Sequence, residues 1–153
     1  MADIALNLVD DAFAFDLGVA ANDLLSADDL ETSVIVSLFS NARAPEDLQL
    51  PAGADRQGWW ADADGEDGEQ LGSLLWTLLR EKQINETLLK ARSYAQDALR
   101  WLVTDGIAVS VVVTAEFIAQ GVLGLGITIA RPNDSKSNYR YAYNWAAQAA
   151  KRI

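Results

Sequence analysis

The sequence predicts an α+β fold: a single domain in which an antiparallel sheet, made of a C-terminal hairpin plus a third strand, packs against one long central helix and a shorter helix. Three observations lead to this prediction. The strongest helical repeat lies in the middle of the chain, two Val- and Gly-rich segments follow it, and an alternating Tyr segment comes after them. The 153 residues, 50% of them hydrophobic, suffice for one core, so we expect one domain over 1–153.

The N-terminal part carries strand signals and one ambiguous segment. Residues 4–20 alternate loosely between apolar and polar side chains, which predicts two short strands that can form a hairpin. Leu30–Phe39 follows a helix-cap signal at Ser26–Asp29, yet its centre, Val34–Val36, is β-branched. Helix and strand therefore both remain open for Leu30–Phe39, and we favour a strand.

A long acidic loop is predicted over 41–70. It holds two of the three prolines and the acidic tract Asp62–Glu69. A loop this long inside a compact domain is usually functional or disordered. Trp59 and Trp60 within it either cover the core or anchor a partner, because Trp is frequent among the residues that dominate binding energy at interfaces.

Two helices are predicted after the loop. Leucines over 71–79 repeat at helical spacing and predict a short helix that runs into Arg80-Glu81-Lys82, which is either a solvated helix end or a contact with a partner. The strongest helix begins at Asn85, which we expect to be its N-cap, and ends before Gly106. Its apolar face comprises Ile84, Leu88, Ala91, Ala95, Ala98 and Leu102.

The C-terminal third predicts the sheet. Ile107–Phe117 and Gly121–Ala130 are joined by a short connection and should pair as an antiparallel hairpin. After a turn, Tyr139, Tyr141 and Tyr143 alternate with other residues as a third strand. Residues 146–153 are Ala-rich, and we expect either a short helix or a mobile end there.

Composition excludes several kinds of chemistry. The chain has no His and no Cys, which removes thiolate nucleophiles, Cys-ligated metal sites and the usual general base. Carboxylate, hydroxyl or Lys chemistry remains open, as does no chemistry at all, and we expect no cofactor and no enzymatic activity. We expect a cytosolic chain that binds no membrane, because the N-terminus has no basic region and no apolar run is long enough to span one. The net charge of −10 argues against nucleic acid as a partner.

The charge is unevenly distributed along the chain. Residues 1–70 hold 16 acidic and two basic residues, a net charge of −14, whereas residues 71–153 hold six acidic and ten basic residues, a net charge of +4. Such asymmetry is typical either of one solvated acidic face or of a subunit that meets different partners at its two ends. Both interpretations remain open.

Three candidate sites have simpler explanations. Asp62-x-Asp64-x-Glu66 resembles the start of a calcium loop, but Asp67 stands where its turn glycine should be, and a solvated acidic loop explains the tract better. Gly121-x-x-Gly124-x-Gly126 lacks the strand–loop–helix context of a phosphate site and fits a strand with closely packed glycines. Two carboxylates could together cleave a glycosidic bond, but residues 1–70 hold 16 acidic side chains, so some pair is expected to be close by chance.

Several short motifs follow one another in a distinctive order along the chain. They are Leu30-Glu-Thr-Ser-Val34, Ser37-Leu-Phe39, Arg43-Ala44, Asp55-Arg-x-Gly-Trp-Trp60, Gly72-Ser-x-Leu-x-Trp76, Leu79-Arg-Glu-Lys82, a helix carrying Tyr94, Ala98 and Leu99, and Asp105-Gly106. Their order resembles that of the Mu-type phage baseplate wedge protein family, and more distantly that of the small wedge or sheath-initiator subunits of contractile tails. The likeness covers the chain from about Asp10 to Trp145.

This resemblance implies a structural subunit of the virion tail baseplate, assembled in the host cytoplasm and present in six copies around the tail tube. It implies contacts with the large wedge protein of the baseplate J type, with tube or hub proteins and with the sheath subunit. In distant relatives a Glu-Pro-Arg element joins a helical bundle with the large wedge protein. This sequence reads Arg80-Glu81-Lys82 at that place, with the Glu and without the Pro, so the resemblance assigns the contact first to Glu81 and then to its two neighbours. Trp59 and Trp60 are further candidates for this wedge interface.

The resemblance also implies strand pairing with the first sheath ring. The hairpin, the termini and the strand carrying Tyr139, Tyr141 and Tyr143 would supply that surface. Two rival functions remain: a tail-associated enzyme that cleaves peptidoglycan with paired carboxylates, and an acidic protein that mimics nucleic acid. The positive net charge of 71–153 weakens the second rival.

Overall fold

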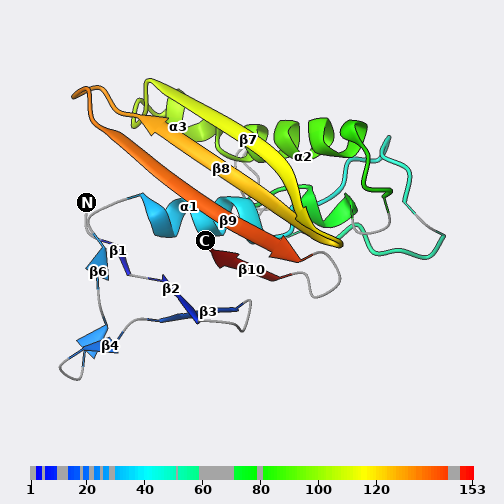
Figure 1. Ribbon diagram of the computed structural model, residues 1–153, viewed down its shortest axis with the longest axis horizontal. Coiled ribbons are helices and arrows are strands. Elements are labelled where there is room, and N and C mark those ends of the chain that lie inside the picture. The colour runs from blue at the N-terminus through cyan, green and yellow to red at the C-terminus, as the bar shows by residue number, and fades with distance from the viewer. Residues whose placement is uncertain are drawn as a thin grey trace.

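The computed structural model describes residues 3–4, 6–9, 14–17, 19–20, 23–24, 26–27, 30–50, 52–58, 71–78, 81–144 and 149–153. Its largest element is a four-stranded antiparallel sheet in the order β10-β9-β8-β7, with helices along one side (Figure 1). This arrangement confirms the predicted α+β class.

The sheet contains the predicted hairpin, β7 (Ser110–Ala119) and β8 (Val122–Ala130), and the predicted third strand, β9 (Lys136–Asn144). The prediction of a helix or a mobile end over 146–153 is wrong for Ala149–Arg152, which form the fourth strand, β10, whereas 146–148 lie outside the described residues. Ala150 is buried opposite Tyr143, so this Ala-rich segment is held by its pairing with β9 rather than by a pattern of its own.

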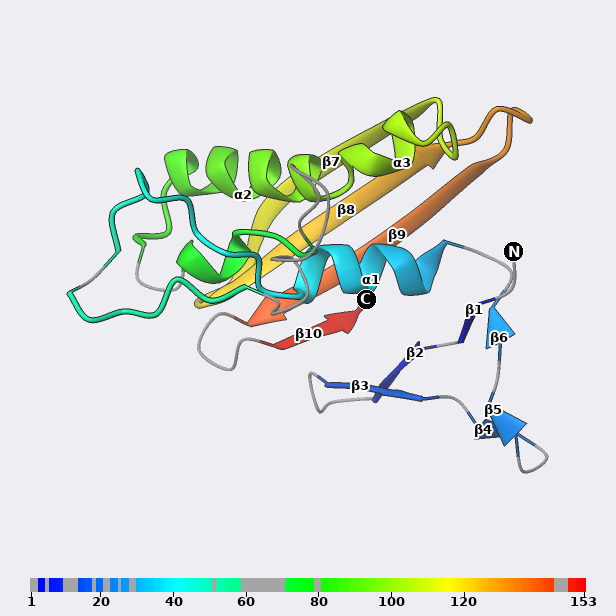
Figure 2. The same cartoon turned by 180° about the vertical axis from the view of Figure 1, so that it is seen from behind.

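The helices α1 (Glu31–Phe39), α2 (Asn85–Ala98) and α3 (Arg100–Thr104) lie on one face of the sheet and leave the other face open (Figures 1 and 2). The core forms between the helices and the covered face, where alternate residues of the two hairpin strands contribute to it: Val111 and Val113 of β7, and Leu123, Leu125, Ile127 and Ile129 of β8. Its largest fully buried side chains are Val34, Leu38, Leu75, Leu78, Leu99, Leu102, Val113, Leu123, Leu125, Ile127, Ile129 and Tyr141.

The prediction of a strand at Leu30–Phe39 is wrong, because nine of these ten residues form the helix α1. Val34, Ile35 and Leu38 are buried in the core, and their spacing places them on one side of a helix but not on one face of a strand. Burial against the sheet therefore outweighs the strand propensity of the β-branched run.

The two predicted helices differ from the structure at their ends. Between residues 71 and 78 only one 3-10 turn, η2 (Leu75–Leu78), forms, because Gly72 adopts φ +100° and the neighbouring Ser73 bonds to the chain beyond α1. The long helix has Ile84 rather than Asn85 at its N-cap, and it is interrupted at Leu99 before α3. Gly106 follows α3 with φ +75°, as expected for a residue just beyond a helix.

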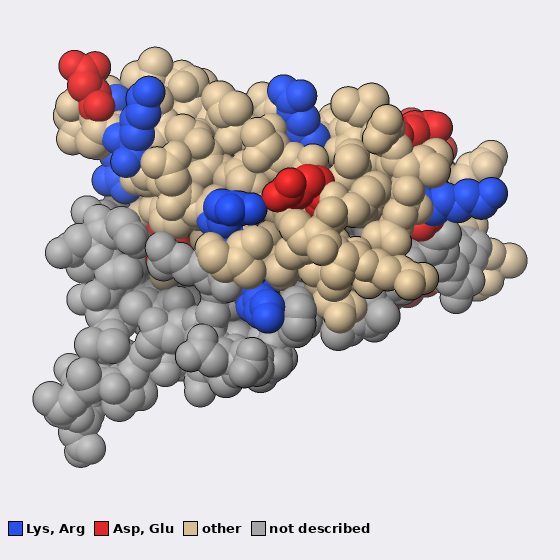
Figure 3. Space-filling model, viewed as in Figure 1, with Lys and Arg blue, Asp and Glu red and all other residues tan. Residues whose placement is uncertain are grey.

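The glycines of β8 confirm the prediction of a closely packed strand. A Cβ at Gly124 would lie 2.9 Å from Ile118 Cγ2, and one at Gly126 would lie 2.5 Å from Thr114 Oγ1. Side chains of β7 thus lie across the glycines of β8 on the open face. Figure 3 shows charged side chains scattered over a largely uncharged face. The exposed Glu116 of β7 and Arg140 of β9 form an ion pair of 3.1 Å.

Short strand pairs make up the described part of residues 3–27. The predicted N-terminal hairpin is confirmed as β2 (Leu6–Val9) with β3 (Ala14–Leu17), which contact β10. The remaining pairs are β1 (Asp3–Ile4) with β6 (Ser26–Ala27) and β4 (Val19–Ala20) with β5 (Asp23–Leu24). Among the described residues no helix is long and apolar enough to cross a membrane.

Candidate functional site

One end of the molecule gathers the irregular segments. The described part of the loop over 41–58, η2 and the turn 81–84 lie together there in both views (Figures 1 and 2), and we call these three segments the loop end. The Gln83 side-chain amide donates to the Ala119 carbonyl at 3.2 Å, which ties the turn to the end of β7.

The loop end is attached to the core by backbone bonds on both sides of Ser73. The Ala42 N–H donates to the Ser73 carbonyl at 3.0 Å, and the Ser73 N–H donates to the Ser40 carbonyl at 2.9 Å. The indole N–H of the buried Trp76 donates to the Ala42 carbonyl at 2.9 Å. These bonds satisfy the polar groups that the chain buries where it leaves α1.

Two glycines let backbone segments meet at this attachment. Gly58 adopts φ +108°, and a Cβ there would lie 2.7 Å from Arg43 Cβ. Gly72 adopts φ +100°, and a Cβ there would collide with the Ser40 carbonyl. Both positions therefore require the conformational freedom and the small size of glycine.

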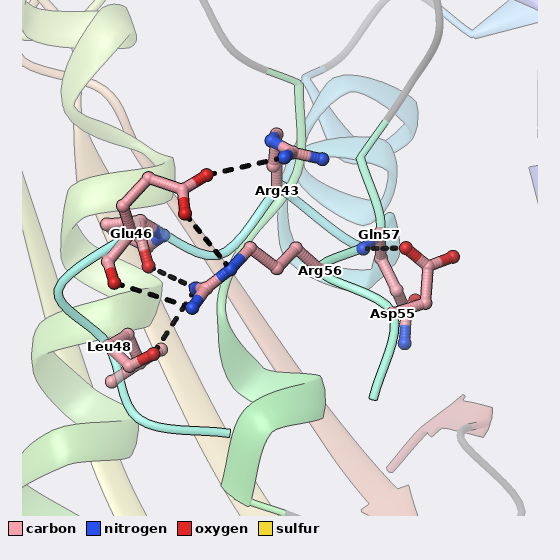
Figure 4. A network of polar contacts seen from close by, with 7 residues as sticks. Arg43, Glu46, Leu48, Asp55, Arg56 and Gln57 are labelled. Carbon is pink, nitrogen blue, oxygen red and sulfur yellow. Dashed lines mark hydrogen bonds and ion pairs between the residues drawn. The ribbon is translucent and has the colours of Figure 1, made fainter. Parts of the chain in front are cut away.

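Arg56 holds the loop in shape (Figure 4). Its guanidinium donates to the carbonyls of Pro45 at 2.5 Å, Leu48 at 3.2 Å and Glu46 at 3.4 Å, and it forms an ion pair of 3.4 Å with the Glu46 carboxylate. Its own carbonyl accepts from the Ala44 N–H at 2.8 Å. The carbonyl bonds matter most, because Glu46 is 81% exposed and an ion pair this exposed contributes little.

Arg56 belongs to a sequence motif, but the sequence analysis assigned it no role. Its role could have been suspected because basic residues are rare in positions 1–70, where Arg43 and Arg56 are the only two. The structure joins both to one network around Glu46, because Arg43 also lies 3.4 Å from that carboxylate (Figure 4).

Three of the five predicted wedge-interface residues, Trp59, Trp60 and Arg80, lie outside the described residues, as does the acidic tract Asp62–Glu69. Within the described residues no group of three or more acidic side chains is placed to hold a metal ion.

The remaining two predicted wedge residues, Glu81 and Lys82, are exposed in the turn before α2. The Glu81 carboxylate lies 3.6 Å from Lys90 Nζ, which also lies 3.8 Å from Glu86. The Lys82 carbonyl accepts from the Thr87 hydroxyl at 2.5 Å and from the Ile84 N–H at 2.9 Å. The turn is thus fixed through its backbone while the Glu81 and Lys82 side chains remain accessible.

The side chains of the three residues predicted for the sheath interface are buried in the core. Tyr139, Tyr141 and Tyr143 are at most 5% exposed, and the Phe39 ring packs against the last two with centroids 5.3 and 5.8 Å away. Burial raises the pKa of Tyr143 to about 12. β9 also lies between β8 and β10, so over 141–144 its backbone is paired on both sides. The alternation indicated a strand correctly but could not show that it is an interior one.

Comparison with known proteins shows which family the chain is similar to. The sequence model of the family described as phage protein GP46 matches residues 30–136, from the start of α1 to the start of β9. Baseplate protein gp46 of Escherichia phage Mu is 42% identical over 120 residues, which cover 78% of this chain and 81% of the Mu protein. Mu-like prophage FluMu protein gp46 of Haemophilus influenzae is 40% identical over 131 residues, covering 86% and 90% of the two chains.

Proposed function

The chain belongs to the phage protein GP46 family, and on this premise we propose that it is a structural wedge subunit of a contractile-tail baseplate, in a phage or in a tail-derived particle. The observation that carries the proposal is the extent of the match to the Mu baseplate protein, which spans most of both chains. In this role the chain has no catalytic activity: it holds other tail proteins in place within the virion.

The loop end is the proposed contact with the large wedge protein of the baseplate J type. Its support is physical: Arg56 fixes an irregular loop in one shape, and bonds to the Lys82 carbonyl fix the turn beside it. A surface held in one conformation loses little conformational entropy on binding. Glu81 offers an accessible carboxylate there, and Arg80, Trp59 and Trp60 complete the proposed contact.

The first sheath ring is the proposed partner of the sheet. Because β9 is interior, strand addition belongs to the edges of the sheet, and β10 already contacts β2 and β3. The edge along β7 therefore takes the role first given to Tyr139, Tyr141 and Tyr143. Three further elements of the proposal rest on the family resemblance alone. They are contacts with tube or hub proteins, a copy number of six and assembly in the host cytoplasm.

Co-purification with the large wedge protein tests the wedge contact. We expect Glu81→Ala to lower recovery of the complex severalfold while the isolated subunit keeps its unfolding temperature, because this carboxylate is exposed. Glu86→Ala is the matched control, since Glu86 is also exposed and shares the same Lys90 partner, 3.8 Å away.

Equal recovery of the complex with Glu81→Ala and with unmodified protein would refute the role of Glu81. Equal loss with both variants would trace the effect to Lys90 or to general charge rather than to a Glu81 contact, and would refute that role as well.

A further inference from the structure

One residue of the loop end is apolar and exposed although the rest of its helix face is covered. The apolar face read from the sequence begins at Ile84, which is 49% exposed in the structure. The later members of that face are buried or half-buried: Leu88, Ala91, Ala95, Ala98 and Leu102. The apolar face therefore extends beyond the core and ends in the turn 81–84.

Ile84 also occupies a backbone position that favours another kind of residue. It is the N-cap of α2 and has the extended conformation of a capping residue, with φ −124° and ψ 166°. Ser, Thr, Asp and Asn are preferred at this position because their side chains accept from the free N–H groups of the first turn, and Ile is among the poorest choices. Among the described residues no side chain caps the start of α2. The sequence thus keeps an apolar side chain here although it costs helix stability.

The backbone around Ile84 is fixed by hydrogen bonds. The Ile84 N–H donates to the Lys82 carbonyl at 2.9 Å, and the Ile84 carbonyl accepts from the Leu88 N–H at 3.3 Å. The Thr87 hydroxyl also donates to the Lys82 carbonyl, at 2.5 Å. A β-branched side chain on a fixed backbone has little conformational entropy to lose when a partner covers it.

Charge alone would give a weak contact at this turn. The Glu81 side chain is 44% exposed and its carboxylate already lies 3.6 Å from Lys90 Nζ, so a cation from a partner would replace one solvated ion pair by another. Covering Ile84 removes apolar area from water without breaking an existing contact. Glu81 and Ile84 belong to one four-residue turn, which a protein interface of ordinary size covers as a whole.

We propose that Ile84 is the apolar anchor of the contact with the large wedge protein, and that Glu81 sets the orientation of this contact. The wedge protein then presents an apolar pocket to Ile84 and a Lys or Arg beside that pocket to Glu81. This inference rests on the proposed function, because the wedge protein is the partner named there. It adds the residue that supplies most of the affinity at the turn and the chemistry of the surface that receives it.

Two exchanges at position 84 separate its apolar side chain from its place at the N-cap. Ile84→Ser removes the apolar side chain but supplies a good N-cap. We expect the affinity for the purified large wedge protein to fall about tenfold, while the unfolding temperature stays the same or rises. Ile84→Val keeps a branched apolar side chain and still provides no cap, so its affinity should lie within about threefold of that of the unmodified protein.

Ile107→Ser is the matched control. Ile107 is 37% exposed and follows α3, which lies at the opposite end of the molecule from the loop end (Figures 1 and 2). The exchange supplies no cap at this position, so we expect the unfolding temperature to fall by about 2–4 °C and the affinity for the wedge protein to stay unchanged. Equal affinities of Ile84→Ser and Ile107→Ser would contradict an anchor at position 84.

Ionic strength separates the role of Ile84 from that of Glu81. The binding that remains in Glu81→Ala should change less with added salt than the binding that remains in Ile84→Ser, because salt screens the Glu81 charge but not an apolar contact. Equal salt dependence of the two variants would contradict this division of roles.

Failure of this inference is distinguishable from failure of the proposed function. Unchanged affinity of Ile84→Ser would overturn the anchor, and so would a fall in its unfolding temperature, because Ile84 would then serve the fold. The wedge contact stands in either case if the unmodified protein binds and Glu81→Ala binds more weakly. If the unmodified protein does not bind the large wedge protein, the wedge contact itself is wrong, and the anchor with it.

Discussion

The loop end and the edge of β7 are two surfaces of one protein that owe their shapes to different forces. The loop end has no helix or strand between residues 41 and 50 or between 52 and 58, and side-chain bonds from Arg56 to three carbonyls hold it. The edge of β7 belongs to a regular strand, and its shape follows from the backbone ladder with β8 and from core packing. Substitutions should therefore disorder the first surface locally, whereas they should change recognition at the second without changing its shape.

The largest effect is expected where the loop end joins the core. Gly72→Ala would bring a Cβ against the Ser40 carbonyl at φ +100°, and we expect it to lower the free energy of unfolding by about 2–4 kcal/mol. Gly53→Ala is the control, because Gly53 also has a positive φ, +78°, but has open space around it. Its cost should be near 1 kcal/mol. Urea unfolding of both variants measures the difference, and equal costs would contradict the close packing at Gly72.

A pH effect of somewhat smaller size is expected on the sheet side. The Tyr143 phenol has a pKa of about 12 in the fold because it is buried, against 10.0 for an exposed phenol. Between these pH values the unfolded chain gives up the proton first, so the free energy of unfolding should fall as the pH rises from about 10 to 12, by about 2–3 kcal/mol. Below pH 10 this group has no effect. Tyr143→Phe should lose this part of the pH dependence, and an unchanged slope would contradict burial of the phenol.

A smaller and local effect is expected within the loop end. Arg56→Ala removes the bonds to the carbonyls of Pro45, Glu46 and Leu48, and we expect a loss of about 1–2 kcal/mol together with faster amide exchange at Ala44 and Leu48. Amides of β7 and β8 should exchange as before. Arg43→Ala, which removes an exposed cation beside the same carboxylate, should change stability by less than about 0.5 kcal/mol. Faster exchange throughout the sheet would contradict a local role for Arg56.

The elements that sequence reasoning predicted well are those with a local signal. The hairpin of β7 and β8 and the buried side of α2 follow from alternation and from a helical repeat that each segment carries within itself. α1 could not be predicted in the same way, because its β-branched residues favour a strand and only burial of Val34 and Leu38 against the sheet decides for a helix. β10 depends on β9 for its existence, and alanines give no pattern from which to read that.

The candidate sites likewise divide into residues that a local sequence signal identifies and residues whose surroundings depend on contacts between distant segments. Glu81 and Lys82 were found from a motif and are accessible in the structure. The alternation of Tyr139, Tyr141 and Tyr143 marks a strand, and the family resemblance assigned that strand to an interface. Which face is buried and whether the strand is interior depend on contacts between distant segments. The edge of β7 could not be singled out, because which strand lies at an edge depends on how all four strands pair.

This Mu-type phage baseplate protein has two proposed contacts, the loop end for the large wedge protein and the edge of β7 for the sheath. The most direct test purifies tail structures from cells that supply either Glu81→Ala or Val112→Lys and measures the amounts of wedge and sheath protein bound to each variant. Val112 is an exposed residue of β7, and a Lys on an edge strand opposes the addition of another strand. We predict that Glu81→Ala loses the wedge protein, while Val112→Lys retains the wedge protein and loses the sheath. Loss of both partners with each variant, or of neither partner with either one, would contradict two separate contacts.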